Sequence, residues 1–162
     1  MVGEIDADIG AAKLYRSPRL TEVGWRDYPG LLKMAAELRD DAWPADELRK
    51  SGRINVTEER RKPNGGFTTA RVPAIAPDML AEGEFNRFYL RALCLHAVAD
   101  GTNNLIIYRA KAVTNSRPDS QAKIDTLINA AALLTDLRSN IGIDTALGLP
   151  PGPNSGPSAR LQ

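Results

Sequence analysis

The chain has 162 residues, of which 43% are hydrophobic and 25% are charged. This composition excludes wholesale disorder and fits one compact domain with a core of its own. Because 21 basic and 20 acidic residues leave a formal net charge of only +1, overall charge steers the chain toward neither nucleic acid nor membrane, and any such attraction must come from a local patch.

The cysteine content and the lengths of the apolar runs indicate the cellular compartment in which the chain is expected. Cys94 is the single cysteine, which excludes an internal disulfide and a cysteine-based zinc site. The first residues have no basic start followed by an apolar run, so we expect no secretory signal there. No apolar stretch approaches the roughly 18 residues that span a bilayer. We therefore expect a cytoplasmic protein with no membrane partner.

Residues 1–26 show no clear apolar period and predict an N-terminal arm, whose first 12 residues carry the acids Glu4, Asp6 and Asp8. Asp27 is a candidate N-cap, and Pro29 suits a first helical turn. Apolar residues at helical spacing then predict a helix over about 28–41, and Trp43-Pro44 ends it. A short helix follows over 45–50, with Gly52 as its C-terminal stop.

A β-hairpin is predicted next. Residues 54–59 alternate in polarity, residues 67–72 form a second strand pattern, and Pro63-Asn64-Gly65-Gly66 between them favours a reversing turn. The stretch from Arg49 to Arg71 holds two acids, Glu58 and Glu59, against seven basic residues: Arg49, Lys50, Arg53, Arg60, Arg61, Lys62 and Arg71. Pairing of this charge with the acidic arm within the chain is one structural explanation of the asymmetry.

The most apolar helix of the chain is predicted from about Glu84 to Asp100, a pattern typical of a domain centre. We expect His96 to be a buried structural residue on its aromatic face. Arg87 and Arg91 lie one turn apart on its narrow polar stripe. Arginine near a core usually pairs with a carboxylate, either within the domain or across a subunit interface, so both arginines are candidate interface residues.

Residues 105–108 predict a buried strand, and a basic loop with Arg109, Lys111 and Arg117 follows. Ser116-Arg117-Pro118-Asp119 resembles a helix start, and an apolar stripe predicts one helix continuing to about Ser139. The segment 148–158 is rich in proline and glycine, which predicts a tail without regular structure.

The predicted fold is α+β: helices packed on a small antiparallel hairpin sheet, with an extended N-terminal arm and a Pro/Gly-rich C-terminal tail. We expect an arm over residues 1–26, a single domain over 27–141 and the tail over 142–162. The strand at 105–108 could add to the hairpin sheet.

Candidate chemistry is sparse. Cys94 and His96 are two residues apart on a helix, so their side chains do not meet as a catalytic pair. Asp78, Glu82 and Glu84 suggest a Mg²⁺ site, but carboxylates also complement a helix N-terminus, and we favour that structural role. No phosphate-binding glycine motif is present. The sequence predicts no catalytic residue, no metal site and no cofactor.

Our leading hypothesis is a non-catalytic structural or interaction subunit of a larger assembly, either a homo-oligomer or a complex with other proteins. Its arm, tail and basic hairpin would make the contacts. This build resembles bacteriophage-type virion or adaptor components, in style of architecture alone. A second hypothesis is a nucleic-acid-binding module, and a third is a metal-dependent enzyme acting on phosphate esters. The candidate nucleic-acid or partner-binding residues are Arg53, Arg60, Arg61, Lys62, Arg71, Arg109, Lys111 and Arg117.

Overall fold

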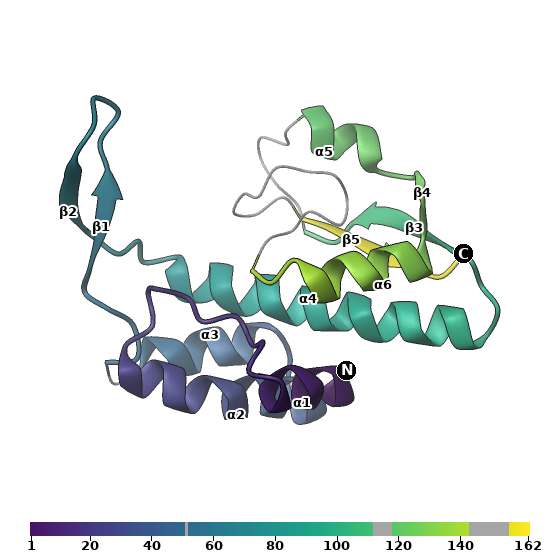
Figure 1. Cartoon of the computed structure of the whole chain (residues 1–162), viewed down its shortest axis with the longest axis horizontal. Helices are drawn as coiled ribbons and strands as arrows, with labels where there is room; N and C mark the ends of the chain where they lie inside the picture. Colours follow the sequence, from purple (N-terminus) through teal and green to yellow (C-terminus); the bar gives the residue numbers. More distant parts are fainter. Residues whose placement is uncertain (51, 112–117, 143–155) are drawn as a thin grey trace. The chain divides into compact units, whose positions relative to one another are not determined.

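The structure, a computed structural model, describes residues 1–50, 52–111, 118–142 and 156–162. The described residues form six helices and five strands (Figure 1), which confirms the predicted α+β class. They divide into two compact units: unit 1 comprises residues 1–14 and 84–162, and unit 2 comprises residues 15–83. The predicted arm, domain and tail boundaries stay a prediction.

In unit 2, helix α2 (Glu22–Leu38) packs beside α3 (Ala42–Arg49). Helix α2 begins six residues earlier than predicted. Thr21 is its N-cap, because the Thr21 hydroxyl accepts a hydrogen bond from the backbone N–H of Gly24 at 3.0 Å. The predicted cap, Asp27, and Pro29 therefore lie inside the helix. The buried side chains of the two helices are Tyr28, Leu32, Ala35, Pro44, Ala45 and Leu48.

An extended segment supports the N-terminus of α2. The backbone N–H of Thr21 donates to the carbonyl of Arg53 at 3.0 Å, and Leu20 forms an isolated antiparallel bridge with Ile54. A Cβ atom on Gly24 would lie 2.1 Å from the Arg53 carbonyl oxygen, so only glycine allows this close approach. Residues 53–55 then lead into the hairpin.

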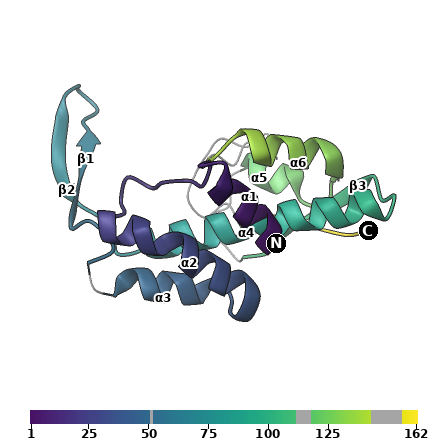
Figure 2. The same cartoon turned by 60° about the horizontal axis from the view of Figure 1, so that its bottom comes forward.

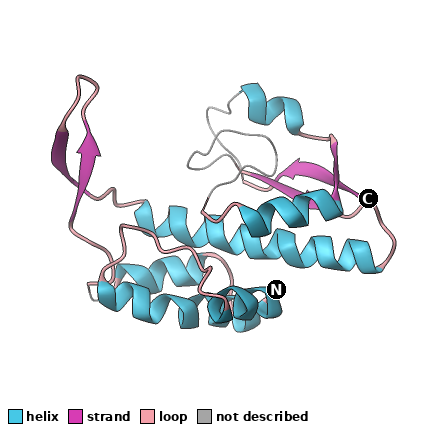
Figure 3. Cartoon of the chain, in the orientation of Figure 1, coloured by secondary structure: helices cyan, strands magenta, loops and turns pink. Residues whose placement is uncertain are grey.

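The hairpin comprises β1 (Thr57–Arg61) and β2 (Phe67–Arg71), paired antiparallel as predicted. It is a two-stranded sheet of its own (magenta in Figure 3). In two views β1 and β2 extend away from α2 and α3 of the same unit (Figures 1 and 2). Helix α4 (Ala76–Ala99) follows, with its residues up to Gly83 in unit 2 and the remainder in unit 1.

Unit 1 contains a three-stranded antiparallel sheet in the order β4-β3-β5. The central strand β3 (Asn104–Arg109) pairs with β4 (Leu127–Asn129) and with β5 (Pro157–Arg160). The predicted strand at 105–108 is thus confirmed, but its addition to the hairpin sheet is wrong. The remaining helices are α1 (Val2–Gly10), α5 (Pro118–Lys123) and α6 (Ala130–Ser139).

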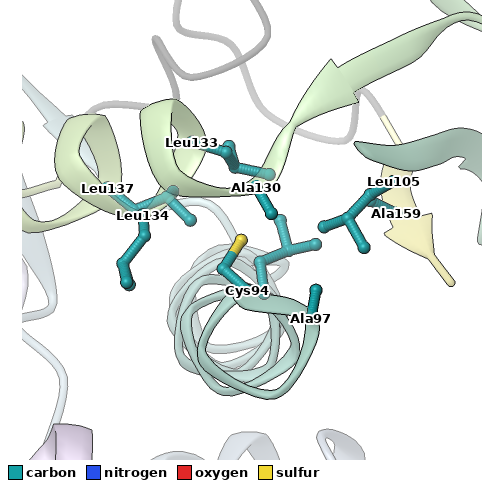
Figure 4. Close-up of a cluster of buried hydrophobic side chains, with 9 residues drawn as sticks. Cys94, Ala97, Leu105, Ala130, Leu133, Leu134, Leu137 and Ala159 are labelled. Atoms are coloured by element: carbon teal, nitrogen blue, oxygen red, sulfur yellow. The ribbon is translucent and has the colours of Figure 1, made fainter. Parts of the chain in front are cut away.

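The core of unit 1 joins α4, α6 and the sheet. Figure 4 shows Cys94 and Ala97 of α4 facing the leucines of α6, with Leu105 of β3 and Ala159 of β5 beside them. The full buried cluster is Leu90, Cys94, Ala97, Leu105, Ala130, Leu133, Leu134, Leu137 and Ala159. Helix α4 is therefore a core helix of this unit, as its apolar composition predicts.

The single helix predicted over 118–139 is wrong. The chain leaves α5 at Lys123, and Asp125 takes a φ of 64° that no helix allows. The backbone N–H of Asp125 then donates to the Ile107 carbonyl at 2.8 Å, and β4 pairs with β3. The hydrogen bonds offered by β3 outweigh the helical period of the apolar residues. Asn129 caps α6 by accepting from the N–H of Ala132 at 2.9 Å.

The C-terminal tail also contains regular structure, contrary to the prediction for residues 157 and 158. Strand β5 pairs with β3, and the Ser158 hydroxyl donates to the Asn86 side-chain oxygen at 2.7 Å. Pro157 has no N–H to donate, which is tolerated at the first residue of an edge strand. The rest of the predicted tail, up to residue 155, lies largely outside the described residues. No helix in the described part of the chain is long and apolar enough to cross a membrane.

Candidate partner-binding hairpin

The basic hairpin, defined here as residues 57–71, is held by its turn and its register. The N–H of Lys62 donates to the Gly66 carbonyl at 3.0 Å, and that of Gly65 donates to the Lys62 carbonyl at 3.1 Å. Gly65 and Gly66 have φ angles of 87° and 76°, so the left-handed positions fall on the two glycines rather than on Asn64. The sequence thus predicts the position of the turn correctly.

The base of the hairpin is held against residues 18–20 of the same unit by hydrogen bonds from an arginine and an asparagine. Arg19 donates to both carboxylate oxygens of Glu58, at 2.6 and 3.3 Å. Hydrogen bonding by Arg19, followed by that of Arg60, lowers the pKa of Glu58. The Asn55 amide donates to the carbonyls of Pro18 and Leu20 at 3.1 and 3.2 Å. These contacts orient the first strand where it leaves the helices.

The register sorts the hairpin side chains onto two faces, because paired residues share a face and faces alternate along a strand. Glu58 and Ala70, the two partly buried members of the strands, lie on the inner face. The exposed face is formed by Thr57, Glu59, Arg61, Phe67, Thr69 and Arg71. On the exposed face, Arg61 lies directly opposite Phe67, and Phe67 is 67% exposed.

Some of the predicted binding residues of this unit form ion pairs with described residues, and others do not. Arg60 pairs with Glu58 at 2.7 Å, and Arg53 pairs with Asp27 at 3.0 Å and donates to the Glu47 carbonyl at 2.8 Å. The side chains of Arg61, Lys62 and Arg71 are exposed and make no ion pair with any described residue. These three cations are therefore available to a partner.

Two of the other predicted cations, Arg109 and Lys111, lie in unit 1, whereas the hairpin lies in unit 2. Arg109 ends β3 and donates to the Gln121 side-chain oxygen at 3.0 Å. Lys111 follows, and its backbone N–H donates to the Gly156 carbonyl at 3.4 Å. Arg117 lies outside the described residues.

The arginines of α4 have partners inside unit 1. Arg91 is buried and forms a bidentate pair with Asp8, at 2.6 and 2.9 Å, and a contact with Glu4 at 2.7 Å. Arg138 also reaches Glu4 at 2.5 Å. Hydrogen bonding by Arg138 first, and by Arg91, lowers the pKa of Glu4. For Arg91 the structure thus has the pairing within the domain that the sequence left open.

Arg87 is also buried, and it donates to the carbonyls of Leu137, at 2.6 Å, and of Asn140. These acceptors lie at the C-terminal end of α6, where helix carbonyls lack partners within the helix. The predicted pairing of the N-terminal acids with the hairpin is wrong for Glu4 and Asp8, whose partners are Arg91 and Arg138. The sequence signal that was missed is the spacing of Glu4 and Asp8, because residues four apart lie on one face of a helix and can share a partner.

The lone histidine is not buried, contrary to the prediction. The His96 side chain is 61% exposed, and its Nδ1 lies 3.1 Å from the carboxylate of Asp100, one turn along α4. The buried face of α4 is the opposite one, on which Cys94 is fully buried. Burial raises the pKa of the Cys94 thiol to about 11. A thiol in this environment is a packing group rather than a nucleophile.

The acidic residues near the start of α4, Asp78, Glu82 and Glu84, do not form a cation site with other described residues. Asp78 pairs with Arg49, and Glu84 is buried, with burial raising its pKa to about 7. Among the residues that the structure describes, no group of three or more His, Cys, Asp or Glu side chains is placed to hold a metal ion.

Comparison with known proteins finds no relative: no protein family, no curated protein and no solved structure matches this chain.

Proposed function

We propose that this protein is a non-catalytic structural or interaction subunit that joins a larger cytoplasmic assembly through its basic hairpin. The observation that carries the proposal is a cluster of exposed cations beside the exposed residue Phe67: Arg61 and Arg71 lie on the exposed face of the hairpin and Lys62 lies in its turn, and none of the three makes an ion pair with a described residue. Like charges gathered on so short an element repel one another, and their positions are explained by a partner of opposite charge.

The attachment of the hairpin supports this role. An isolated two-stranded hairpin is marginally stable in water, yet this one is braced at its base through Arg19, Glu58 and Asn55. A braced hairpin loses less conformational freedom when a partner binds, which favours affinity.

The arm and tail contribute less to the proposal than their sequences suggest. Ile5 of α1 and Ala159 of β5 are fully buried within unit 1, so these segments serve the chain's own core. We therefore assign the partner contact to the hairpin, with a second copy of the chain or another macromolecule as the partner.

Site-specific photo-crosslinking in the cells that make this protein tests the proposal without assuming the class of partner. A photoreactive residue replaces Thr69 on the exposed face of the full chain. The matched control carries it at Leu38, which is 73% exposed at the end of α2 in the same unit. We expect a discrete adduct from position 69 that position 38 does not give. Identical adduct patterns from the two positions would refute the hairpin as the partner-binding surface.

A further inference from the structure

We propose that the exposed face of the basic hairpin and its turn bind single-stranded nucleic acid, with Phe67 stacking on a base, and with Arg61 and Arg71 of the face and Lys62 of the turn contacting phosphates. This inference rests on the proposed function, because it takes the hairpin as the contact surface and adds the chemical class of the partner. Recognition of single strands combines basic groups that follow the backbone with aromatic rings on which bases stack.

The register places these groups at useful distances. Arg61 and Phe67 are directly opposite on the exposed face, and side chains opposite each other have Cβ atoms roughly 5 Å apart. A base stacked on the ring therefore brings its phosphate within reach of the guanidinium. Arg71 lies four residues farther along β2 on the same face, about 13 Å away at the rise of a strand. The face is long enough to contact several consecutive nucleotides.

The charge balance favours a polyanion over an added protein strand. Both edges of the hairpin lack a strand partner among the described residues, but cationic side chains on an edge oppose strand addition. The only acid on the exposed face is Glu59, opposite Thr69. Charge placed solely to prevent aggregation does not account for Phe67, whose ring is exposed beside a cation and has no ring contact with described residues.

Fluorescence anisotropy of a labelled 15-nucleotide oligothymidine with the full chain tests the proposal. Three phosphate contacts predict a slope of about −2 in the logarithm of affinity against the logarithm of salt concentration, at about −0.7 per contact on single strands. The double variant Arg61→Ala, Lys62→Ala should weaken binding and bring the slope to about −0.7. The control variant Lys13→Ala, Lys123→Ala removes the same charge from exposed positions in unit 1 and should leave both quantities unchanged.

The stacking contact has its own variant pair. Phe67→Ala should weaken binding by about 5- to 140-fold, as expected for the loss of one stacked base, with the salt slope unchanged. Phe67→Tyr keeps an aromatic face and should retain the affinity. Tryptophan fluorescence checks folding, because Trp25 and Trp43 both lie in unit 2 with the hairpin.

Four outcomes overturn the inference: no binding of the oligonucleotide at low salt, equal losses in the lysine control, an unchanged affinity in Phe67→Ala, or tighter binding of polyglutamate or of duplex DNA than of the oligonucleotide. Failure here is distinguishable from failure of the proposed function. A hairpin-specific adduct to a protein in the crosslinking experiment, with no oligonucleotide binding, rejects the nucleic acid and keeps the hairpin as the contact surface.

Discussion

Replacing Glu84 with glutamine should stabilise the protein at pH 8 much more than at pH 5. Glu84 is buried at the start of the unit 1 part of α4, and burial raises the pKa of its carboxyl from 4.5 to about 7. The positive charges of Arg87 and Arg91 oppose this rise, and the negative charge of Asp8 adds to it. The folded state therefore holds the Glu84 proton more tightly than the unfolded chain does.

The sign and size follow from proton linkage. A group whose pKa is raised on folding contributes stability that is complete below its unfolded pKa and is lost as pH rises through its folded pKa. Here the loss runs from about pH 4.5 to about pH 7. At 1.36 kcal/mol per pKa unit, a rise from 4.5 to about 7 corresponds to about 3 kcal/mol of lost stability once the group is ionised. Glutamine has a similar shape and no charge, so it avoids this loss.

Urea unfolding of the full chain, followed by far-ultraviolet circular dichroism at pH 5 and pH 8, measures the effect. The free energy of unfolding of Glu84→Gln relative to the natural protein should rise by about 2 to 3 kcal/mol between the two pH values. Glu4 has a lowered pKa and loses its contribution as pH falls, but this term is common to both proteins and cancels in the difference. A difference that does not change with pH refutes the reasoning that burial governs this carboxyl.

Three further predictions concern packing. Arg91→Ala leaves two carboxylates of α1 without their buried cation and should lower the free energy of unfolding by about 3 to 5 kcal/mol. Arg138→Ala removes a side chain that is 45% exposed and should lower the free energy of unfolding by at most about 1 kcal/mol. Similar losses for the two variants would contradict the buried network. Gly24→Ala brings a methyl group 2.1 Å from the Arg53 carbonyl oxygen and should destabilise unit 2 by about 1 to 3 kcal/mol, detected by tryptophan fluorescence in urea, and an unchanged midpoint would count against the close approach. Cys94 should react with iodoacetamide only on unfolding, because its thiol is buried with a pKa of about 11, and rapid labelling in native buffer would show the core to be open.

Local chemistry made much of this protein readable in advance. The Asn-Gly-Gly turn and alternating strands specify the hairpin through backbone conformations that neighbouring residues set themselves. The apolar run of residues 84–99 specifies a core helix by composition alone. The basic residues around the turn were predicted as a candidate surface for the same reason, since an element this short has little interior in which to bury them.

Tertiary structure decided which residues those elements engage. The helical period of residues 124–129 gives way because β3 offers them hydrogen bonds, and residues 157–160 become a strand for the same reason. The exposure of His96 and the burial of Arg91 depend on which face of α4 is covered by α1 and α6. A sequence period reports how a segment is patterned, whereas strand pairing and the choice of buried face are contacts between distant residues. Only the folded chain therefore shows that Glu4 and Asp8 pair with Arg91 and Arg138, and that Arg61, Lys62 and Arg71 make no ion pair with a described residue.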